Sequence, residues 1–441
     1  MLALLGYIMV AVFMALIMTK RMSALLALII VPIVFALIGG FYTGIGDMML
    51  EGIKQVAPTG VMLVFAILYF GIMIDAGLFE PIVNTILRIV KGDPLKIALG
   101  TVALASLVAL DGDGTTTFII TVTAMLPLYK KLNMNLYMLS TLALLSIGVM
   151  NMTPWGGPTA RVISSLQLTT EEVFLPLIPV MAAGIAFAFL VAWHFGLKER
   201  KRIGIFKMDD PIASEIQAAK EQTAAAVDHG EKFAELQRPK LIWVNAGLTI
   251  GLLIALIAGL LPLPVLFMLG FAIAAMINYP NLVQQKERIA AHAGNVLAVV
   301  ALVFASGIFT GIMNGTGMVD AMATALVQII PEQLGTQLPL ITAITSMPFT
   351  YFMANDPYYY GIIPIIGETA ASYNIPMAEI ARASVLGQPA HVLSPLYAAG
   401  YLLVGMIGID YGQNQRFALK WAVGSSVFMI IAAIAFGVIS I

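Results

Sequence analysis

The chain has no cysteine and few charged residues. None of its 441 residues is cysteine, which excludes disulfides, thiolate metal sites and cysteine nucleophiles. Asp, Glu, Lys and Arg together make up only 11% of the chain, and a formal net charge of -1 argues against a nucleic-acid partner. In contrast, 60% of the residues are hydrophobic and the mean hydropathy is +0.94. This composition predicts an integral membrane protein whose surroundings are a lipid bilayer.

Apolar stretches approaching the length of a membrane helix, about 20 residues, occur five times in each half. The predicted spans lie near 2–18, 24–40, 59–78, 136–165 and 174–197, and near 241–260, 264–279, 292–312, 380–409 and 418–440. After the third span of each set, residues 97–129 and 337–371 are interrupted at their centres by acidic clusters, which predicts re-entrant hairpins. The predicted fold class is therefore an all-α integral membrane protein with five membrane spans and one re-entrant hairpin per half.

The two halves are predicted to be inverted repeats. An odd number of spans forces the halves into opposite orientations. Residues 71–80 align without gaps onto 311–320, an offset of 311 minus 71, or 240. We therefore expect a first repeat over 1–197, a linker over 198–240 and a second repeat over 241–441.

Positive charge gives the predicted orientation, because Lys and Arg collect on the cytoplasmic side. The layout places 20 of the 23 basic residues on one side, the exceptions being Lys54, Arg161 and Arg382. The linker, with one amphipathic helix, is then cytoplasmic in a multi-pass cell-membrane protein. Arg161 is a candidate clamp for a substrate carboxylate, because an arginine fork suits that group. Arg382 could bind a carboxylate in the same way, or its side chain could snorkel to the membrane surface.

The centre of the first predicted hairpin reads DGDGTTT over residues 111–117. Carboxylate and hydroxyl oxygens are hard ligands of the kind that Mg²⁺ and Ca²⁺ take, and Mg²⁺ often shares its remaining positions with an anionic substrate. The alternative is that Asp111 and Asp113 cap the returning helix, while Gly112 and Gly114 permit the turn.

The second hairpin and two further breaks, the Gly- and Pro-containing runs at 151–158 and 387–395, offer more candidates. Asp356 precedes Pro357 and could be an ordinary helix N-cap. The tyrosines at 358–360 could be interfacial aromatics. His391 lies in a predicted membrane break, where it is either a satisfied core histidine or a proton carrier. The helix ends at the four breaks favour an anion, and unwound carbonyls favour a cation.

Several of these runs resemble the citrate-metal:proton symporters, the CitMHS family of the ion transporter superfamily. The runs are LDGDGTTT at 110–117, NMTPWGGPTAR at 151–161, GMVDAMA at 317–323, and ND at 355–356 followed by YG at 360–361. The resemblance implies proton-driven uptake of citrate as a complex with a divalent metal of the Mg²⁺ or Ca²⁺ class. It also implies a homodimer whose transport domain moves as an elevator, and no permanently bound cofactor.

The expected site combines these residues with the implied substrate. Asp113 and Asp356 are expected to lie close to the metal, and Asp111 and His391 to carry protons. Residues expected to bind citrate are Gly112, Gly114, Thr115, Thr116, Asn151, Gly156, Gly157, Arg161, Asn355 and Ser394.

Two other classes of function remain as alternatives. A sodium-coupled di- or tricarboxylate transporter, or a cation-proton antiporter, would use the same scaffold. An intramembrane aspartyl protease is a remote alternative, because residues 44–47 read GIGD. That enzyme needs a second aspartate, usually in a Tyr-Asp pair, and the chain has no Tyr-Asp dipeptide. We therefore do not expect an enzyme.

Overall fold

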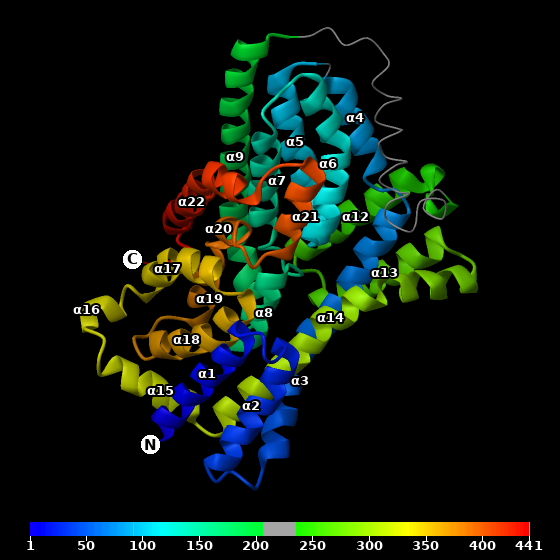
Figure 1. The fold of residues 1–441 in the computed structure, drawn as a ribbon. Coiled ribbons are helices and arrows are strands. Elements are labelled where there is room, and N and C mark those ends of the chain that lie inside the picture. Colours follow the sequence, from blue (N-terminus) through cyan, green and yellow to red (C-terminus); the bar gives the residue numbers. More distant parts are fainter. Residues whose placement is uncertain (91, 206–234, 441) are drawn as a thin grey trace.

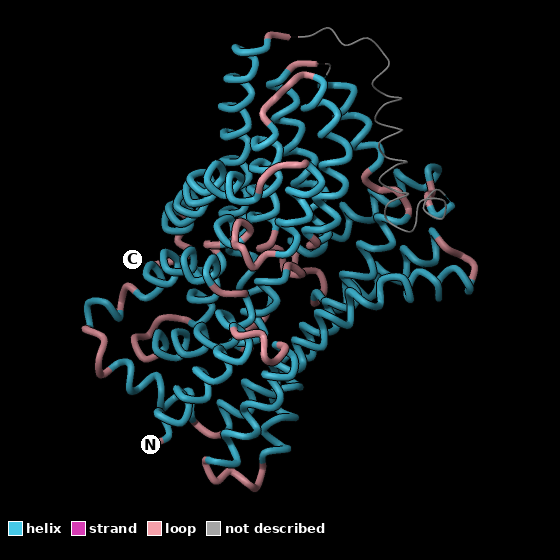
Figure 2. The backbone as a smooth tube through the Cα atoms, viewed as in Figure 1, coloured by secondary structure: helices cyan, strands magenta, loops and turns pink. Residues whose placement is uncertain are grey.

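The computed structural model describes residues 1–90, 92–205 and 235–440, whose regular elements are helices joined by loops (Figures 1 and 2). The helices of the first half are α1 (Leu2–Met18), α2 (Ala24–Ile38), α3 (Ile45–Asp75), α4 (Glu80–Val90), α5 (Pro94–Val108), the 3₁₀ turn η1 (Ala109–Asp111), α6 (Gly114–Lys131), α7 (Leu136–Met150), α8 (Gly157–Leu166) and α9 (Thr170–Ile203).

The second half begins with the 3₁₀ turn η2 (Pro239–Leu241). Its helices are α12 (Ile242–Ile257), α13 (Leu263–Asn278), α14 (Leu282–Gly315), α15 (Met318–Val327), α16 (Glu332–Gly335), α17 (Leu338–Phe352), the π-helical turn η3 (Pro357–Ile362), α18 (Ile363–Ala371), α19 (Met377–Val385), α20 (Gln388–His391), α21 (Ala398–Ile407) and α22 (Tyr411–Ala435).

Polar side chains fix where many of the helices begin. Asp93 caps α5 by accepting from the Leu95 N–H, and Pro94 occupies the first helical position. Thr169 and Glu172 form a reciprocal capping box at the start of α9. These caps satisfy backbone N–H groups of the first turn, which have no carbonyl partner within the helix. They separate apolar runs that would otherwise continue into each other.

The long helices α3 and α14 cross as an antiparallel pair (Figure 1). Gly52 lies against Gly307 and Gly311 near one end of the pair, and Gly71 lies against His292 near the other. A Cβ atom on Gly52 would meet the Gly307 carbonyl oxygen, so only glycine permits this approach. Small residues allow such close contact between membrane helices. Helices α13 and α2 pack beside the pair, on α3 and on α14 respectively.

A second group of helices carries both hairpins. The first hairpin, α5–η1–α6, packs on α7, and α5 also packs on α9. In the second hairpin, α17 packs on α19 and α20, and α18 packs on α15 and α19. Helices α9 and α22 contact each other and close the group. The hairpins therefore occupy 94–131 and 338–371, close to the predicted 97–129 and 337–371.

The outer surface is apolar, as expected for contact with lipid. Six helical stretches of the described chain are long and apolar enough to cross a membrane: Ile45–Asp75, Pro94–Asp111, Thr170–Ile203, Pro239–Ile257, Leu282–Gly315 and Tyr411–Ala435. Ile254 and Ile257 on α12, and Leu269 and Met276 on α13, expose large apolar side chains. Exposure of that kind on several helices is typical of a membrane protein. The prediction of an all-helical, multi-pass membrane protein is confirmed.

Some predicted boundaries are wrong. The third span of each half was expected over 59–78 and 292–312, but α3 begins at Ile45 and α14 at Leu282. Polar residues such as Glu51 and Lys54 lower the local hydropathy, yet they lie exposed on helix that continues beyond the apolar part. The short helices α4 and α15, which follow these spans, were not predicted.

The fourth span of each half is discontinuous. Residues 136–165 divide into α7 and α8, and residues 380–409 divide into α19, α20 and α21. The interruptions fall at the Gly- and Pro-rich runs that predicted breaks within these spans. Helix α9 continues to Ile203, beyond the predicted end at residue 197. The amphipathic helix expected in the linker lies outside the described residues.

Candidate functional site

The first hairpin turns at Gly112 and restarts at Asp113. Gly112 has φ of +79°, a left-handed conformation that favours glycine. Asp113 is the N-cap of α6: its Oδ1 accepts from the Thr115 N–H at 3.1 Å and its Oδ2 from the Thr116 N–H at 2.9 Å. The Thr116 hydroxyl also donates to Oδ2, at 2.7 Å. The capping alternative is therefore observed for Asp113.

Asp111 has a different environment. Its Oδ1 accepts from the Asp113 N–H at 2.8 Å, while its Oδ2 is buried without a hydrogen-bond partner among the described residues. The residue is only 8% exposed. A buried carboxylate oxygen without a partner is costly, because it has lost its water and gained nothing in return. This oxygen is free to bind a proton or a cation.

Two aromatic residues that the sequence did not single out enclose the first tip. The Trp155 indole N–H donates to the Leu110 carbonyl at 2.7 Å, and its ring lies directly over Gly112. The Tyr397 hydroxyl occupies the space beside Gly114, where a Cβ atom would collide with it. Both aromatics lie at or near the predicted breaks, at 151–158 and 387–395, and that position is the only signal that could have found them.

The second tip is organised by an ion pair. The Arg161 Nε lies 2.6 Å from Asp356 Oδ1, and its Nη1 donates to the Gly157 carbonyl at 3.0 Å. Asp356 occupies the N-cap position of the turn that follows, with Pro357 beside it as expected, but its side chain makes no cap hydrogen bond. Pro357 begins a π-helical turn, η3, of a kind that is frequent at functional sites.

The tyrosines of η3 are also not interfacial, as one alternative had it. Tyr358, Tyr359 and Tyr360 are fully buried. The Tyr359 hydroxyl accepts from the Gln388 side chain at 2.9 Å, and the same amide lies 3.5 Å from Asn355 Oδ1. Gln388 therefore connects the second tip to the break between α19 and α21.

His391 and Ser394 are held by backbone. His391 is buried, and its Nδ1 donates to the Thr350 carbonyl at 2.6 Å, so one of its two ring nitrogens is satisfied by the backbone. Its ring also contacts Tyr397, with centroids 5.8 Å apart. The Ser394 hydroxyl donates to the Tyr351 carbonyl at 2.6 Å and accepts from the Leu396 N–H at 3.1 Å. These bonds fix the backbone of the break.

The break between α7 and α8 is similarly tight. Asn151 is buried, and a Cβ on Gly156 would collide with the Asn151 carbonyl oxygen. A Cβ on Gly157 would lie 2.8 Å from Arg161 Nη1, so this glycine leaves room for the guanidinium. Arg382 belongs to neither tip. It donates to the carbonyls of Val438 at 3.1 Å and Glu172 at 2.9 Å, so the protein's own backbone holds its guanidinium.

The candidate residues thus form two clusters. The first contains Asp111, Gly112 and Gly114 with Trp155 and Tyr397, and the Tyr397 ring contacts His391. Asp356 and Asn355 lie with Arg161, Tyr359 and Gln388. In the described chain no three His, Asp or Glu side chains are grouped so as to hold a metal ion. A metal bound here would therefore bring further ligands with it.

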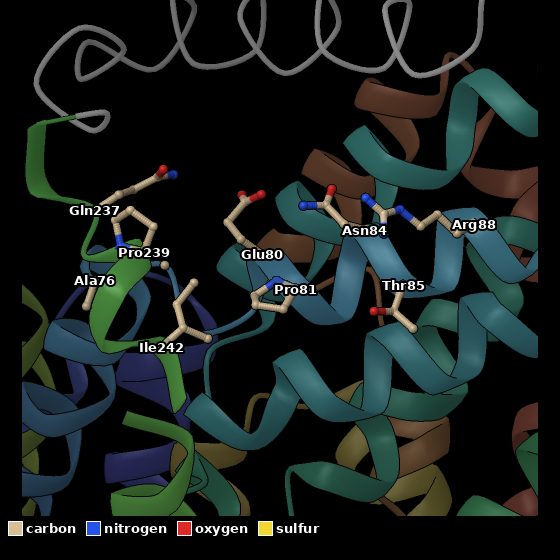
Figure 3. Close-up of a pocket in the computed structure, with 10 residues that line it drawn as sticks. Ala76, Glu80, Pro81, Asn84, Thr85, Arg88, Gln237, Pro239 and Ile242 are labelled. Carbon is tan, nitrogen blue, oxygen red and sulfur yellow. The ribbon is translucent and has the colours of Figure 1, made fainter. Parts of the chain in front are cut away.

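Two pockets lie near the helix groups. A pocket of about 470 Å³ is lined by Asp356 together with residues of α2 and α14. Another, of about 410 Å³, lies between α4 and the residues around η2, where Glu80, Asn84 and Arg88 face Gln237 and Pro239 (Figure 3). Of the tip residues, only Asp356 lines either pocket.

Known proteins match most or all of the chain. The CitMHS family, described as "Citrate transporter", matches residues 5–387. A Bacillus subtilis (strain 168) protein named "Citrate transporter" is 58% identical over 440 residues, and one named "Mg(2+)/citrate complex secondary transporter" is 52% identical over 442, each covering 100% of both chains. The structure of the Alcanivorax borkumensis YdaH transporter is 13% identical and shares the fold with a TM-score of 0.53. The match covers 91% of this chain and 89% of the YdaH chain. The chain belongs to the CitMHS family of citrate transporters and is not an enzyme.

Proposed function

We propose that the protein is a secondary transporter that takes up citrate as a complex with a divalent metal, driven by protons. The observation that carries this proposal is the full-length identity of 52% to a relative named for the Mg²⁺/citrate complex. The two tips agree with a substrate of mixed charge, because they present carboxylates at Asp111 and Asp356 and a guanidinium at Arg161. A metal-citrate complex offers a partner to each of these groups.

We propose that the two halves are inverted repeats. Helices α3 and α14 hold the same place in the element order of their halves, and they run antiparallel side by side. Their neighbours agree, because α13 packs on α3 as α2 packs on α14. Halves in opposite orientations give the two faces of the membrane equivalent access routes, which is how many transporters alternate access.

The packing also supports an elevator motion. The scaffold in this proposal consists of α1–α3 and α12–α14, and the moving group consists of the hairpins with α7–α9 and α19–α22. In the second hairpin, η3 packs on α1, and Gly361 lies against Met14. In the first hairpin, α6 packs mainly on α5, α7 and α21 instead. Such unequal docking of related hairpins is expected when the moving group lies at one end of its path.

The site residues have distinct proposed roles. Asp113 and Asp356 lie near the metal, and the remaining metal ligands come from citrate and water. Asp111 and His391 carry protons, with Asp111 Oδ2 the better candidate because it has no partner among the described residues. Citrate carboxylates are held by Arg161 and by polar groups of the tips and breaks, namely Gly112, Gly114, Thr115, Thr116, Asn151, Gly156, Gly157, Asn355 and Ser394.

Further parts of the proposal concern the whole assembly. A homodimer is proposed by analogy with the superfamily. The linker 198–240 is proposed to be cytoplasmic, because basic residues crowd at its start, including Arg200 and Arg202. Helices α12 and α13 are proposed to face the lipid, because they expose large apolar side chains.

Uptake of labelled citrate into proteoliposomes tests the proposal. The cation is varied between Mg²⁺, Ca²⁺ and Na⁺, with EDTA as the metal-free condition, under an inward proton gradient. Uptake that requires a divalent ion and collapses with the proton gradient is expected. Uptake that is indifferent to EDTA but requires Na⁺ would instead assign the chain to the sodium-coupled carboxylate transporters.

A further inference from the structure

The ion pair between Arg161 and Asp356 joins the two halves of the chain. Arg161 lies on α8 of the first half, and Asp356 lies at the tip of the second hairpin. Nε and Oδ1 are 2.6 Å apart, and the two side chains are 20% and 19% exposed. A pair this shielded from solvent is held firmly, because separating it leaves a charge without a partner.

The Arg161 guanidinium keeps donors that a second carboxylate could take. Arginine has five N–H donors in a planar fork; Asp356 takes the one on Nε, and the Gly157 carbonyl takes one on Nη1. The contact is therefore monodentate, whereas a carboxylate that faces the fork can take two donors at once. Asp356 also lines the pocket of about 470 Å³ beside α14, so the acidic member of the pair lies at the edge of a space and not inside solid packing.

We propose that this pair exchanges partners when substrate binds, an inference that rests on the proposed function. A citrate carboxylate takes the Arg161 guanidinium, and the released Asp356 carboxylate turns to the metal of the same complex. In the empty site, Asp356 substitutes for the substrate carboxylate on Arg161. The salt bridge between the protein's own side chains is thus replaced by two contacts with the substrate.

The exchange explains why only the complex satisfies the site. Citrate alone would occupy Arg161 but leave Asp356 unpaired beside further carboxylates. The metal alone would attract Asp356 but leave Arg161 without a partner. Either partial state strands a charge in a shielded site, which is costly. The metal-citrate complex supplies a partner to both residues, so Arg161 and Asp356 together determine specificity for a metal-bound anion.

Binding of labelled citrate to the purified full-length protein tests this inference. Its dissociation constant is measured in MgCl₂ and in EDTA, and the ratio of the two defines the metal preference. In Asp356→Asn, Arg161 has lost its internal competitor and the metal has lost a ligand. The metal preference is expected to fall about tenfold or more, the effect of one lost contact to a charged group. Binding in EDTA is expected to be no weaker than in the wild type.

Two further variants separate this role from a structural one. Arg161→Gln is expected to weaken citrate binding with and without Mg²⁺. The double variant Arg161→Gln/Asp356→Asn leaves no unpaired charge, so it is expected to fold and yet not to bind citrate. If the pair only holds the halves together, the double variant recovers binding. Asp47→Asn, which alters an exposed residue in the first turn of α3, is the charge control and keeps the wild-type preference.

The outcomes distinguish the inference from the proposed function. Wild-type protein whose citrate binding ignores Mg²⁺ would refute the proposed function itself. Wild-type protein with a clear metal preference that Asp356→Asn fully retains would refute only the exchange. Equal weakening of both forms in Asp356→Asn would also overturn it, because that is the pattern of lost structure.

Discussion

Asp111 and Asp113 are two residues apart, yet their carboxylates differ in their hydrogen bonds. Asp113 uses both oxygens to cap α6. Asp111 uses one oxygen in the turn and keeps the other buried and unpartnered within the described chain. An acidic residue placed in this way inside a membrane protein is a functional candidate by default. The sequence DGDG could not separate the two roles, because both residues have the same chemistry and similar neighbours.

Replacing Asp111 by Asn tests its part in proton coupling. The amide oxygen of Asn can still accept the Asp113 N–H, but the side chain cannot take up a proton. We expect Asp111→Asn to exchange metal-citrate across the membrane at a rate within about threefold of the wild type and to lose accumulation driven by a proton gradient. Both are measured in proteoliposomes, with the gradient present or collapsed. Asp410→Asn, at the cap of α22, should behave as the wild type. Gradient-driven accumulation in Asp111→Asn would rule out this role.

The helices could be predicted largely because lipid imposes long apolar runs and because Gly, Pro and Asp interrupt them. The hairpins and the divided fourth spans follow from those interruptions. The contacts across the tips could not be predicted. Arg161 and Asp356 are 195 residues apart in the chain, and no local pattern indicates that they meet. The contact of Tyr397 with Gly114 is equally absent from any local pattern. The π-helical turn at Pro357 could not be predicted either, because its sequence is that of an ordinary helix start.

Among the elements, the crossing of α3 and α14 sets the most stringent packing requirement. We expect Gly52→Ala to lower stability by about 1–3 kcal/mol or more, because its methyl group meets the backbone of α14 and cannot rotate away. Thermal unfolding in detergent measures this loss. Gly294→Ala is the matched control on α14, where the added methyl meets nothing within 4 Å. It should be neutral or slightly stabilising, by up to about 1 kcal/mol. Equal melting temperatures for the two variants would contradict the close crossing.

In the proposed elevator, the whole molecule divides into a scaffold around α3 and α14 and a moving group that carries both hairpins. Their contact includes η3 on α1 and α8 on α14. One apolar cluster combines side chains from both sides of this boundary, with Phe13 and Phe309 of the scaffold beside Tyr360 and Ile365 of the second hairpin. If the group moves as proposed, this cluster must separate and re-form during each cycle.

A cross-link between α1 and the second hairpin tests that movement. Gly361 lies against Met14, so that a Cβ atom at position 361 would be 3.4 Å from Met14 Cγ, and the chain has no native cysteine to interfere. We expect Met14→Cys/Gly361→Cys to be bridged by Hg²⁺ and to stop transporting by more than about tenfold, with recovery after a thiol is added. The two single-cysteine variants under the same treatment are the controls. Full transport by the bridged protein would show that this contact stays closed.

Trp155 also lies on the boundary between the two groups, which makes it an optical probe. It reaches from the first tip to Phe70 on α3 and Phe267 on α13, with ring centroids 5.1 and 5.0 Å away. The other three tryptophans are Trp193, Trp243 and Trp421. Replacing these three by Phe leaves one emitter, whose fluorescence should shift when metal-citrate is added and stay constant with citrate in EDTA. An unchanged spectrum on saturation would place Trp155 outside the moving boundary. Loading of the site could thus be followed by emitted light, without a label or a liposome.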